Sequence, residues 1–303
     1  MTSTLPPRAV VVTRPTEYEE LLHHHATRAM AAFFLSTRGR RVEDVEEAHR
    51  VVRGAVDLVL GAIPLAWRRA LVARSDLDRF LFEPEDVVVT VGQDGLVANV
   101  AKYVKGQIVI GINPSPAMYD GVLARHRPRD TADLVRAATR ETGARRGIEE
   151  RTMVEAALPD GQRLLALNEV YLGHRTHQSS RYVLSYGEAS ERHSSSGIVV
   201  ATGTGATGWA RSIHGSRRSS APLPAPTAES LVFFVREAFP SVKTGTTLVD
   251  GTVAHGAALH VASEMNEGGV VFGDGIEEDH LDLPYGQTVD VRAANDRLRL
   301  LAA

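Results

Sequence analysis

The amino-acid sequence predicts an α+β protein with an N-terminal α/β domain built on a parallel sheet and a C-terminal, mostly β, sandwich-like domain. Two observations lead to this fold class. Up to about residue 128, long apolar runs alternate with segments of helical spacing. From Thr152 onward, short alternating runs are separated by Gly, Ser and Asp. We therefore expect an α/β domain over residues 1–128 and a mostly β domain over residues 129–303.

The first domain is expected to begin with a strand and two helices. Arg8 to Thr13 is a β-branched run, and residues 16–19 after Pro15 have the pattern of a capping box, which predicts a helix through about Leu35. Apolar residues then recur at three- and four-residue spacing over residues 42–59. This spacing predicts a second helix with one buried face.

A strand, a helix and another strand are expected next. Residues 86–91 and 107–112 are nearly unbroken apolar runs, which is typical of strands that are buried on both faces of a parallel sheet. Residues 96–104 between them have helical spacing, so this stretch predicts one βαβ unit. Residues 130–142 predict one amphipathic helix.

The second domain is expected to consist of short strands joined by turns. The predicted strands cover residues 152–158, 164–172, 182–186, 198–202, 247–249, 259–263 and 283–291. Residues 216–228 are rich in Ser, Pro and Ala and predict an exposed loop.

Composition and charge exclude several classes of function. The chain has no cysteine, which excludes disulfides, thiolate nucleophiles, thiolate zinc sites and iron–sulfur clusters. Its 34 basic and 37 acidic residues leave a formal net charge of -3, which gives no electrostatic footprint for nucleic acid. No apolar stretch has the length of a membrane span, and the first residues lack an apolar leader. We expect a cytoplasmic protein without nucleic-acid or membrane partners.

The first candidate site is the run Gly92-Gln93-Asp94-Gly95, which lies between a buried strand and a helix. Open α/β sheets bind ligands at this position, where glycines let backbone N–H groups approach a phosphate. Asp94 would repel that phosphate, so it suits a Mg²⁺ contact or the acceptor of a proton from an attacking hydroxyl. An ordinary Asp-Gly turn explains the same residues. Asn113 follows the next strand in the equivalent place.

Two further candidates lie in the second domain. Residues 203–208 match the GxGxxG pattern, but the crossover helix and acidic residue of a dinucleotide-binding turn do not follow. We interpret this run as a ligand-contacting loop or a plain glycine-rich turn. Asn168 and Glu169 interrupt an apolar strand, where a buried Glu needs a partner. Ribose hydroxyls, an adenine amine or a structural hydrogen-bond network would each satisfy it.

Other motifs do not support a site. Residues 23–25 are three consecutive histidines in a predicted helix, where neighbouring side chains diverge by about 100° and cannot chelate one metal together. The sequence contains neither the P-loop pattern nor GxSxG, which excludes an ordinary P-loop kinase.

Taken together, these motifs and their order resemble the NAD kinase family, and its mitochondrial branch in particular. The matching segments are Gly92–Leu96 for the GGDGT loop, Gly111–Asn113 for a GxN turn, Leu167–Val170 for the Asn-Glu motif, Ser195–Gly197 for SSG, and Thr202–Gly205 with Trp209 for TGTGxxxW. Segments around Arg14, Arg236 and Asp250 are similar to that branch as well.

The resemblance implies a Rossmann-like N-terminal domain and transfer of the ATP γ-phosphate to the 2′-hydroxyl of the adenosine ribose of NAD, with Mg²⁺. Asp94 would position or deprotonate that hydroxyl, and the nucleotide would bind in one crevice between the two domains. The nucleotide-binding residues would be Gly92, Gln93, Gly95, Asn113, Asn168, Glu169, Ser196, Thr202, Gly203, Thr204 and Gly205. No residue is assigned as a dedicated metal ligand, and a homodimer is expected.

The sequence departs from the family pattern at three positions. Gln93 replaces the second glycine of the GGDGT loop, Leu96 replaces its threonine, and Ala206 stands where a serine is expected. Two alternatives therefore stay open: a kinase of another nucleoside or nucleotide hydroxyl, and a non-catalytic nucleotide-binding homologue. The sequence does not decide whether ATP or polyphosphate is the phosphate donor.

Overall fold

The computed structural model describes residues 6–139 and 147–302, and the chain folds into two compact units. Unit 1 extends to Glu149 and also takes in the chain from Arg299 on, whereas unit 2 is Glu150–Leu298. Helix α5 (Thr131–Thr139), which follows the predicted boundary at residue 128, buries Val135 and Ala138 in the core of unit 1.

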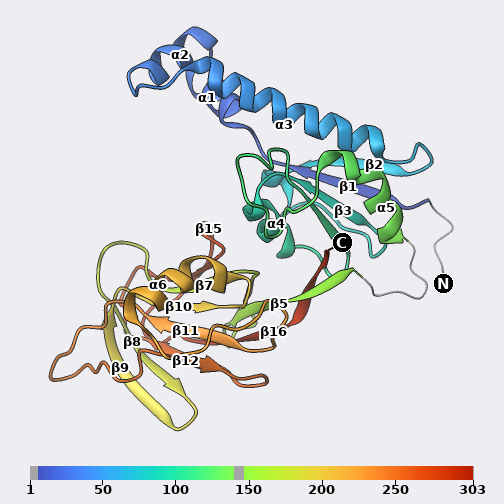
Figure 1. The fold of residues 1–303 in the computed structure, drawn as a ribbon. Coiled ribbons are helices and arrows are strands. Elements are labelled where there is room, and N and C mark those ends of the chain that lie inside the picture. The colour runs from blue at the N-terminus through green and yellow to red at the C-terminus, as the bar shows by residue number, and fades with distance from the viewer. Residues whose placement is uncertain (1–5, 140–146, 303) are drawn as a thin grey trace. The chain divides into compact units, whose positions relative to one another are not determined.

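Unit 1 is built on a parallel sheet. Its strands, in the spatial order β2-β1-β3-β4, are β2 (Arg68–Ala73), β1 (Arg8–Thr13), β3 (Val87–Val91) and β4 (Ile108–Ile112). The end of β16 (Thr288–Leu301) joins this sheet, because Arg299 and Leu300 pair in parallel with β4. Val87, Val89 and Val91 of β3 pack with apolar residues of α3 and α5, the two helices labelled beside this sheet in Figure 1. All five residues of β3 are buried, which explains its almost wholly apolar sequence.

The described part of unit 1 contains five α-helices. They are α1 (Glu17–His25), α2 (Arg28–Ser36), α3 (Val42–Ala62), α4 (Asp94–Ala101) and α5. The capping box predicted at Thr16 is present, since Thr16 and Glu19 bond each other's backbone N–H groups. The single helix expected up to Leu35 is wrong, because Ala26 takes a φ of 61° and ends α1 there. Thr27 then caps α2 by accepting a hydrogen bond from the N–H of Met30.

Unit 2 contains two sheets and one α-helix, α6 (Trp209–Arg217). The first sheet is antiparallel and has the order β12-β11-β10-β7-β14-β15. These strands are β12 (Asp250–Val253), β11 (Leu231–Val235), β10 (Ile198–Ala201), β7 (Glu169–His174), β14 (Gly269–Gly273) and β15 (Ile276–Asp282). The second consists of β16, β13 (Leu259–Ser263), β8 (Ser180–Tyr186) and β9 (Ala189–Ser195), with β5 (Ile148–Ala157) and β6 (Arg163–Ala166) paired to one another.

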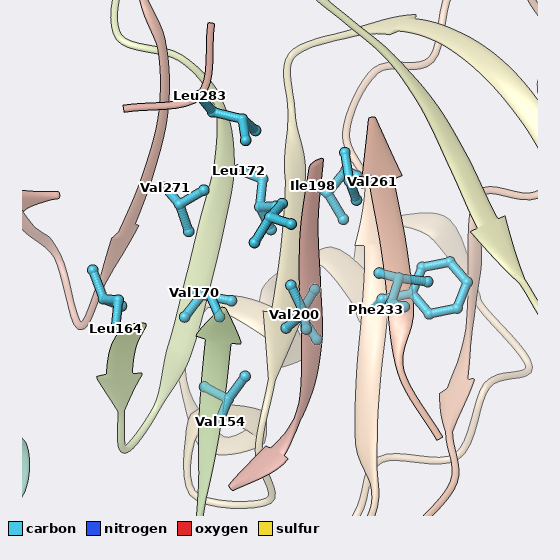
Figure 2. Packing of buried hydrophobic residues seen from close by; sticks show 14 of the residues in the cluster. Val154, Leu164, Val170, Leu172, Ile198, Val200, Phe233, Val261, Val271 and Leu283 are labelled. Carbon is cyan, nitrogen blue, oxygen red and sulfur yellow. The ribbon is translucent and has the colours of Figure 1, made fainter. Parts of the chain in front are cut away.

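A shared apolar core lies between these two sheets. Val170, Val200 and Phe233 come from the first sheet, and Val154 and Val261 come from the second; Figure 2 shows their side chains gathered in one cluster. All five side chains are almost completely shielded from solvent. The mostly β, sandwich-like second domain is therefore confirmed.

Several strand boundaries differ from the sequence prediction. The strand expected over residues 164–172 is two strands, because the chain bends at Leu167 and Asn168. The strand expected over residues 247–249 is absent, and β12 begins one residue later, at Asp250. Strands β2, β9, β11, β14 and β15 were not predicted. Polar or charged residues occupy much of β2, β9 and β15, whereas β11 and β14 are apolar runs of strand length. No helix within the described ranges has both the length and the apolar character needed to cross a bilayer.

Candidate functional site

The carboxyl ends of β1, β3 and β4 form one edge of the sheet in unit 1, and the Gly92 loop and Asn113 both lie at this edge. The N–H of Gly92 donates to the carbonyl of Ile112 over 3.0 Å, which joins the two loops. Asn113 donates from Nδ2 to the carbonyl of Tyr119 (2.8 Å) and accepts from the N–H of Ser115 (2.9 Å). Asn113 therefore shapes the turn that follows β4.

Asp94 is the first residue of α4, and neighbouring backbone groups hold its carboxylate. Its Oδ1 accepts hydrogen bonds from the N–H groups of Leu123 (2.9 Å) and Ala124 (2.8 Å), and its Oδ2 accepts one from Val122 (3.0 Å). A carboxylate offers about four lone-pair positions, so about one stays open to a further donor. Asp94 is thus a fixed acceptor with room for one additional hydrogen bond.

A pocket of about 260 Å³ opens at this edge, and we call it the edge pocket. Residues of its wall include Arg14, Thr16, His49, Gly92, Gln93 and Ser115. Leu96 does not line the pocket, because its side chain is buried and would lie 3.0 Å from a Cβ added to Gly92. The residue that replaces the family's threonine is therefore a core side chain.

In unit 2, the bend between β6 and β7 is held from two sides. The carboxylate of Asp274 accepts hydrogen bonds from the N–H groups of Leu167 (2.9 Å) and Asn168 (2.7 Å). On the other side, Thr202 donates from Oγ1 to the carbonyl of Leu167 (2.6 Å) and from its N–H to the carbonyl of Asn168 (2.9 Å). Sequence reasoning missed Asp274; a signal for it was the turn pattern Gly273-Asp274-Gly275.

The Thr202–Gly205 loop packs directly on this bend. Thr202 Oγ1 accepts from the N–H groups of Thr204 (3.1 Å) and Gly205 (3.2 Å). A Cβ on Gly205 would lie 2.2 Å from the carbonyl oxygen of Asn168 and 3.0 Å from Oε2 of Glu169. The structure thus brings the Asn168-Glu169 pair and this loop together.

A methyl group at Gly205 should disturb this packing. We expect Gly205→Ala to lower the free energy of unfolding by about 1–3 kcal/mol, because the added Cβ collides with backbone rather than with a side chain that can move. Thermal denaturation measures the loss. The matched control is Gly215→Ala in α6, where no atom lies within 4 Å of the added Cβ, and it should be neutral or stabilising. Equal stability of the two variants would contradict the close packing.

Glu169 has an unusual electrostatic environment. Burial, and to a smaller extent the nearby Asp274 carboxylate, together raise the pKa of its carboxyl from 4.5 to about 7. No described residue hydrogen-bonds this carboxyl group. Near neutral pH, Glu169 can therefore either donate or accept a hydrogen bond to a ligand hydroxyl.

Ser196 lies apart from the Asn168-Glu169 pair. It precedes β10, whereas Thr202 follows that strand, so the two residues lie near opposite ends. Ser196 lines a larger pocket of about 710 Å³ together with Tyr171, Trp209 and Arg236. The rings of Tyr171 and Trp209 stack at 6.1 Å, and the Arg236 guanidinium lies 5.2 Å from the Trp209 ring centre.

The described residues suit Mg²⁺ only if substrate phosphates supply most of its ligands. Over residues 6–139 and 147–302, no three His, Asp or Glu side chains are grouped to hold a metal ion. Mg²⁺ commonly binds through one or two carboxylates plus substrate phosphates and water. Asp94 has about one free lone-pair position, so it could give Mg²⁺ a single ligand only while that position accepts no hydrogen bond.

Comparison with known proteins identifies the class of fold. No model of a protein family matches the chain. An NAD kinase from Archaeoglobus fulgidus in complex with ATP superposes with a TM-score of 0.58 at 18% identity, over 97% of this chain and 93% of that one. Yeast NADH kinase complexed with NADH superposes with a TM-score of 0.59 at 14% identity, over 99% of this chain and 84% of that one. The chain has the fold of these kinases, with a Rossmann-like first domain and a β second domain.

A sequence relative points the same way. The chain is 29% identical over 169 residues to the NAD kinase of Chlorobium luteolum, a match that covers 54% of each protein. The chain therefore spans about half the length of this curated relative. The resemblance to NAD kinases is confirmed at the level of the fold and of this partial match, whereas its mitochondrial type stays a prediction.

Proposed function

We propose that the chain is an ATP-dependent phosphotransferase that acts on the 2′-hydroxyl of the adenosine ribose of NAD. The observation that carries this proposal is the Asn168-Glu169 pair, which is packed against the Thr202–Gly205 loop and presents a carboxyl group that no residue of 6–139 or 147–302 hydrogen-bonds. Ribose hydroxyls supply the hydrogen bonds that such a group requires. The fold is that of solved structures named as an NAD kinase and an NADH kinase.

In this proposal Asn168 and Glu169 hold the adenosine half of NAD, and Thr202, Gly203 and Thr204 line the same part of the site. Asp94 accepts the proton of the 2′-hydroxyl through its open lone pair. The 2′ oxygen forms a bond to the γ-phosphorus, the bond from that phosphorus to the bridging oxygen breaks, and ADP leaves. Most of the rate acceleration comes from holding the two substrates in the correct geometry, which suits a site with few charged side chains.

The remaining site residues act on phosphate. Gly92, Gln93 and Gly95 lie at the start of α4, where backbone N–H groups and the helix dipole favour an anion. Mg²⁺ would neutralise charge on the transferred phosphoryl group. Asn113 does not contact phosphate itself but holds the turn after β4 in place. Ser196 offers a hydroxyl for nucleotide binding from the wall of the larger pocket. The family resemblance alone supports Mg²⁺, a homodimer and a cytoplasmic location, which belong to this proposal.

The test is direct formation of NADP. Purified protein is incubated with Mg-ATP and NAD, and NADP is measured with an NADP-specific dehydrogenase. We expect NADP from the wild type and about a tenfold lower yield from Asn168→Ala, because removing the amide leaves a ribose hydroxyl unsatisfied, at a cost of about 1–3 kcal/mol. A wild-type protein that binds ATP and forms no NADP, while phosphorylating another nucleoside, would contradict the proposed acceptor.

A further inference from the structure

We propose that residues 236–249 form a latch over the free edge of strand β9 and that protonation of His193 opens this latch. Residues 236–249 join β11 to β12, and we call them the latch segment. The proposal goes beyond the proposed function, because none of the groups that operate the latch belongs to the proposed nucleotide site. It describes a pH-sensitive device within unit 2.

The latch segment covers β9, which is the last strand in its sheet. The N–H of Phe239 donates to the carbonyl of Ser194 over 2.8 Å. The N–H of Gly245 donates in the same way to the carbonyl of Arg192 over 3.0 Å. Between these two contacts the segment reaches into solvent, where Val242 is fully exposed. The latch segment therefore protects a strand edge that could otherwise pair with another chain.

The carboxylate of Glu191 on β9 holds the end of the latch segment. Its Oε2 accepts hydrogen bonds from the N–H groups of Thr247 (2.9 Å) and Leu248 (2.8 Å). Its Oε1 lies close to Gly245, where an added Cβ would approach it to 2.0 Å. Because a carboxylate oxygen has about two lone pairs, Oε2 has no acceptor position left for a further donor.

The imidazole of His193 lies beside this carboxylate and is completely shielded from solvent. Its Nε2 lies 3.3 Å from Oε2 of Glu191, yet neither ring nitrogen makes a hydrogen bond to a residue of 6–139 or 147–302. The ring of Tyr182 on β8 lies 5.5 Å away, but its hydroxyl already shares a hydrogen bond with Ser195. His193 is thus a buried base whose two nitrogens are unused.

The surroundings of His193 favour its neutral form. Burial lowers the pKa of the imidazole below 6.5, whereas Glu191 and the Leu248 backbone act in the opposite direction. Burial also raises the pKa of Tyr182, which therefore stays neutral. Other charged side chains of β8, β9 and the latch segment are exposed or form ion pairs elsewhere; they are Arg181, Arg192, Arg236, Glu237 and Lys243.

Protonation of His193 opposes the closed latch. The imidazolium needs acceptors for two N–H groups, and Oε2 of Glu191 can bond one of them only by releasing the N–H of Thr247 or Leu248. A buried charge without such a partner is costly, whereas opening of the latch segment lets water reach the ring. The closed state is therefore fully stable above about pH 6.5 and loses stability as the pH falls below that value.

The test is hydrogen–deuterium exchange, measured by mass spectrometry on the full chain at pH 7.5 and pH 5.5. Labelling times are scaled for the intrinsic change of the exchange rate with pH. We expect peptides from the latch segment to lose protection by up to about tenfold at pH 5.5, because an exposed imidazole is then about ten-to-one protonated. His193→Phe cannot take up a proton, so its latch segment should be equally protected at both pH values.

The matched control is His260→Gln, which removes an exposed histidine from β13 and should respond to pH as the wild type does. Thermal denaturation at pH 7.5 checks the folding of each variant, and His193→Gln replaces His193→Phe if the latter is unfolded. Equal protection of the wild-type segment at both pH values, or a wild-type response in the His193 variant, would overturn the proposal. So would an equal loss of protection in β7 and β10, which would mean general loosening of unit 2. None of these outcomes depends on NADP formation.

Discussion

Replacing Asp94 by asparagine is expected to lower kcat for NADP formation by about 10²–10⁴-fold, the usual contribution of a positioned general base. An amide keeps a carbonyl oxygen for two of the N–H donors that now bond Asp94, but its NH₂ group cannot accept a proton. Steady-state kinetics with NAD as the varied substrate measures the effect. We expect kcat to fall while the Kd for ATP stays within a few-fold.

The matched control is Asp120→Asn, an exposed aspartate in the segment just before the residues that contact Asp94. Its kcat should equal that of the wild type. Because the amide also loses one backbone hydrogen bond at Val122, the folding of Asp94→Asn is checked by thermal denaturation. A well-folded Asp94→Asn protein with wild-type turnover would show that Asp94 is a structural residue only.

Replacing Glu169 by glutamine is expected to change how stability depends on pH. The folded-state pKa of Glu169 is raised from 4.5 to about 7, so the folded protein keeps a proton that the unfolded chain releases. The stability from this proton is complete below about pH 4.5 and is lost as pH rises to 7, at up to about 1.4 kcal/mol per pH unit. Glutamine does not titrate, so at pH 8 the variant should be more stable by about 2 kcal/mol, after allowance for partial solvent exposure.

Urea denaturation at pH 5, 6, 7 and 8 checks this expectation. The difference between wild type and Glu169→Gln should grow through this range, whereas Glu188→Gln, at an exposed turn between β8 and β9, should show no such trend. A constant difference across the range would mean that Glu169 titrates like an exposed glutamate, and would remove the reason for expecting a ligand at that carboxyl group.

In unit 1, the strands that the sequence predicts correctly are those where burial dictates residue type. Strands β3 and β4 are buried almost throughout, so their apolar runs are unambiguous. Helix α3 buries one face, which produces its regular spacing. By contrast, β9 is a polar strand at the edge of its sheet, and it is held by pairing with β8 along its whole length. Because few of its residues are apolar, the hydrophobic pattern of the sequence does not predict such a strand.

The parts of the candidate site that could not be predicted depend on distant residues. The break at Asn168 exists because Asp274, more than a hundred positions away, caps two backbone N–H groups. Similarly, the three backbone donors that hold Asp94 come from about 30 positions further along the chain. The order of the motifs along the sequence predicts which loops form the site. The structure shows which backbone N–H groups hold those loops in place.

The final residues of β16 have a consequence for synthesis on the ribosome. Arg299 and Leu300 add the last strand beside β4, and the imidazole of His126 lies 2.9 Å from the carbonyl oxygen of Leu301. The α/β unit therefore emerges early with one strand edge uncovered, and it stays so until residue 301 has been translated. The unpaired N–H and C=O groups of an uncovered strand edge can pair with strands of other nascent chains, which leads to aggregation. Slow or interrupted translation of the second half should therefore be costly for the yield of folded protein.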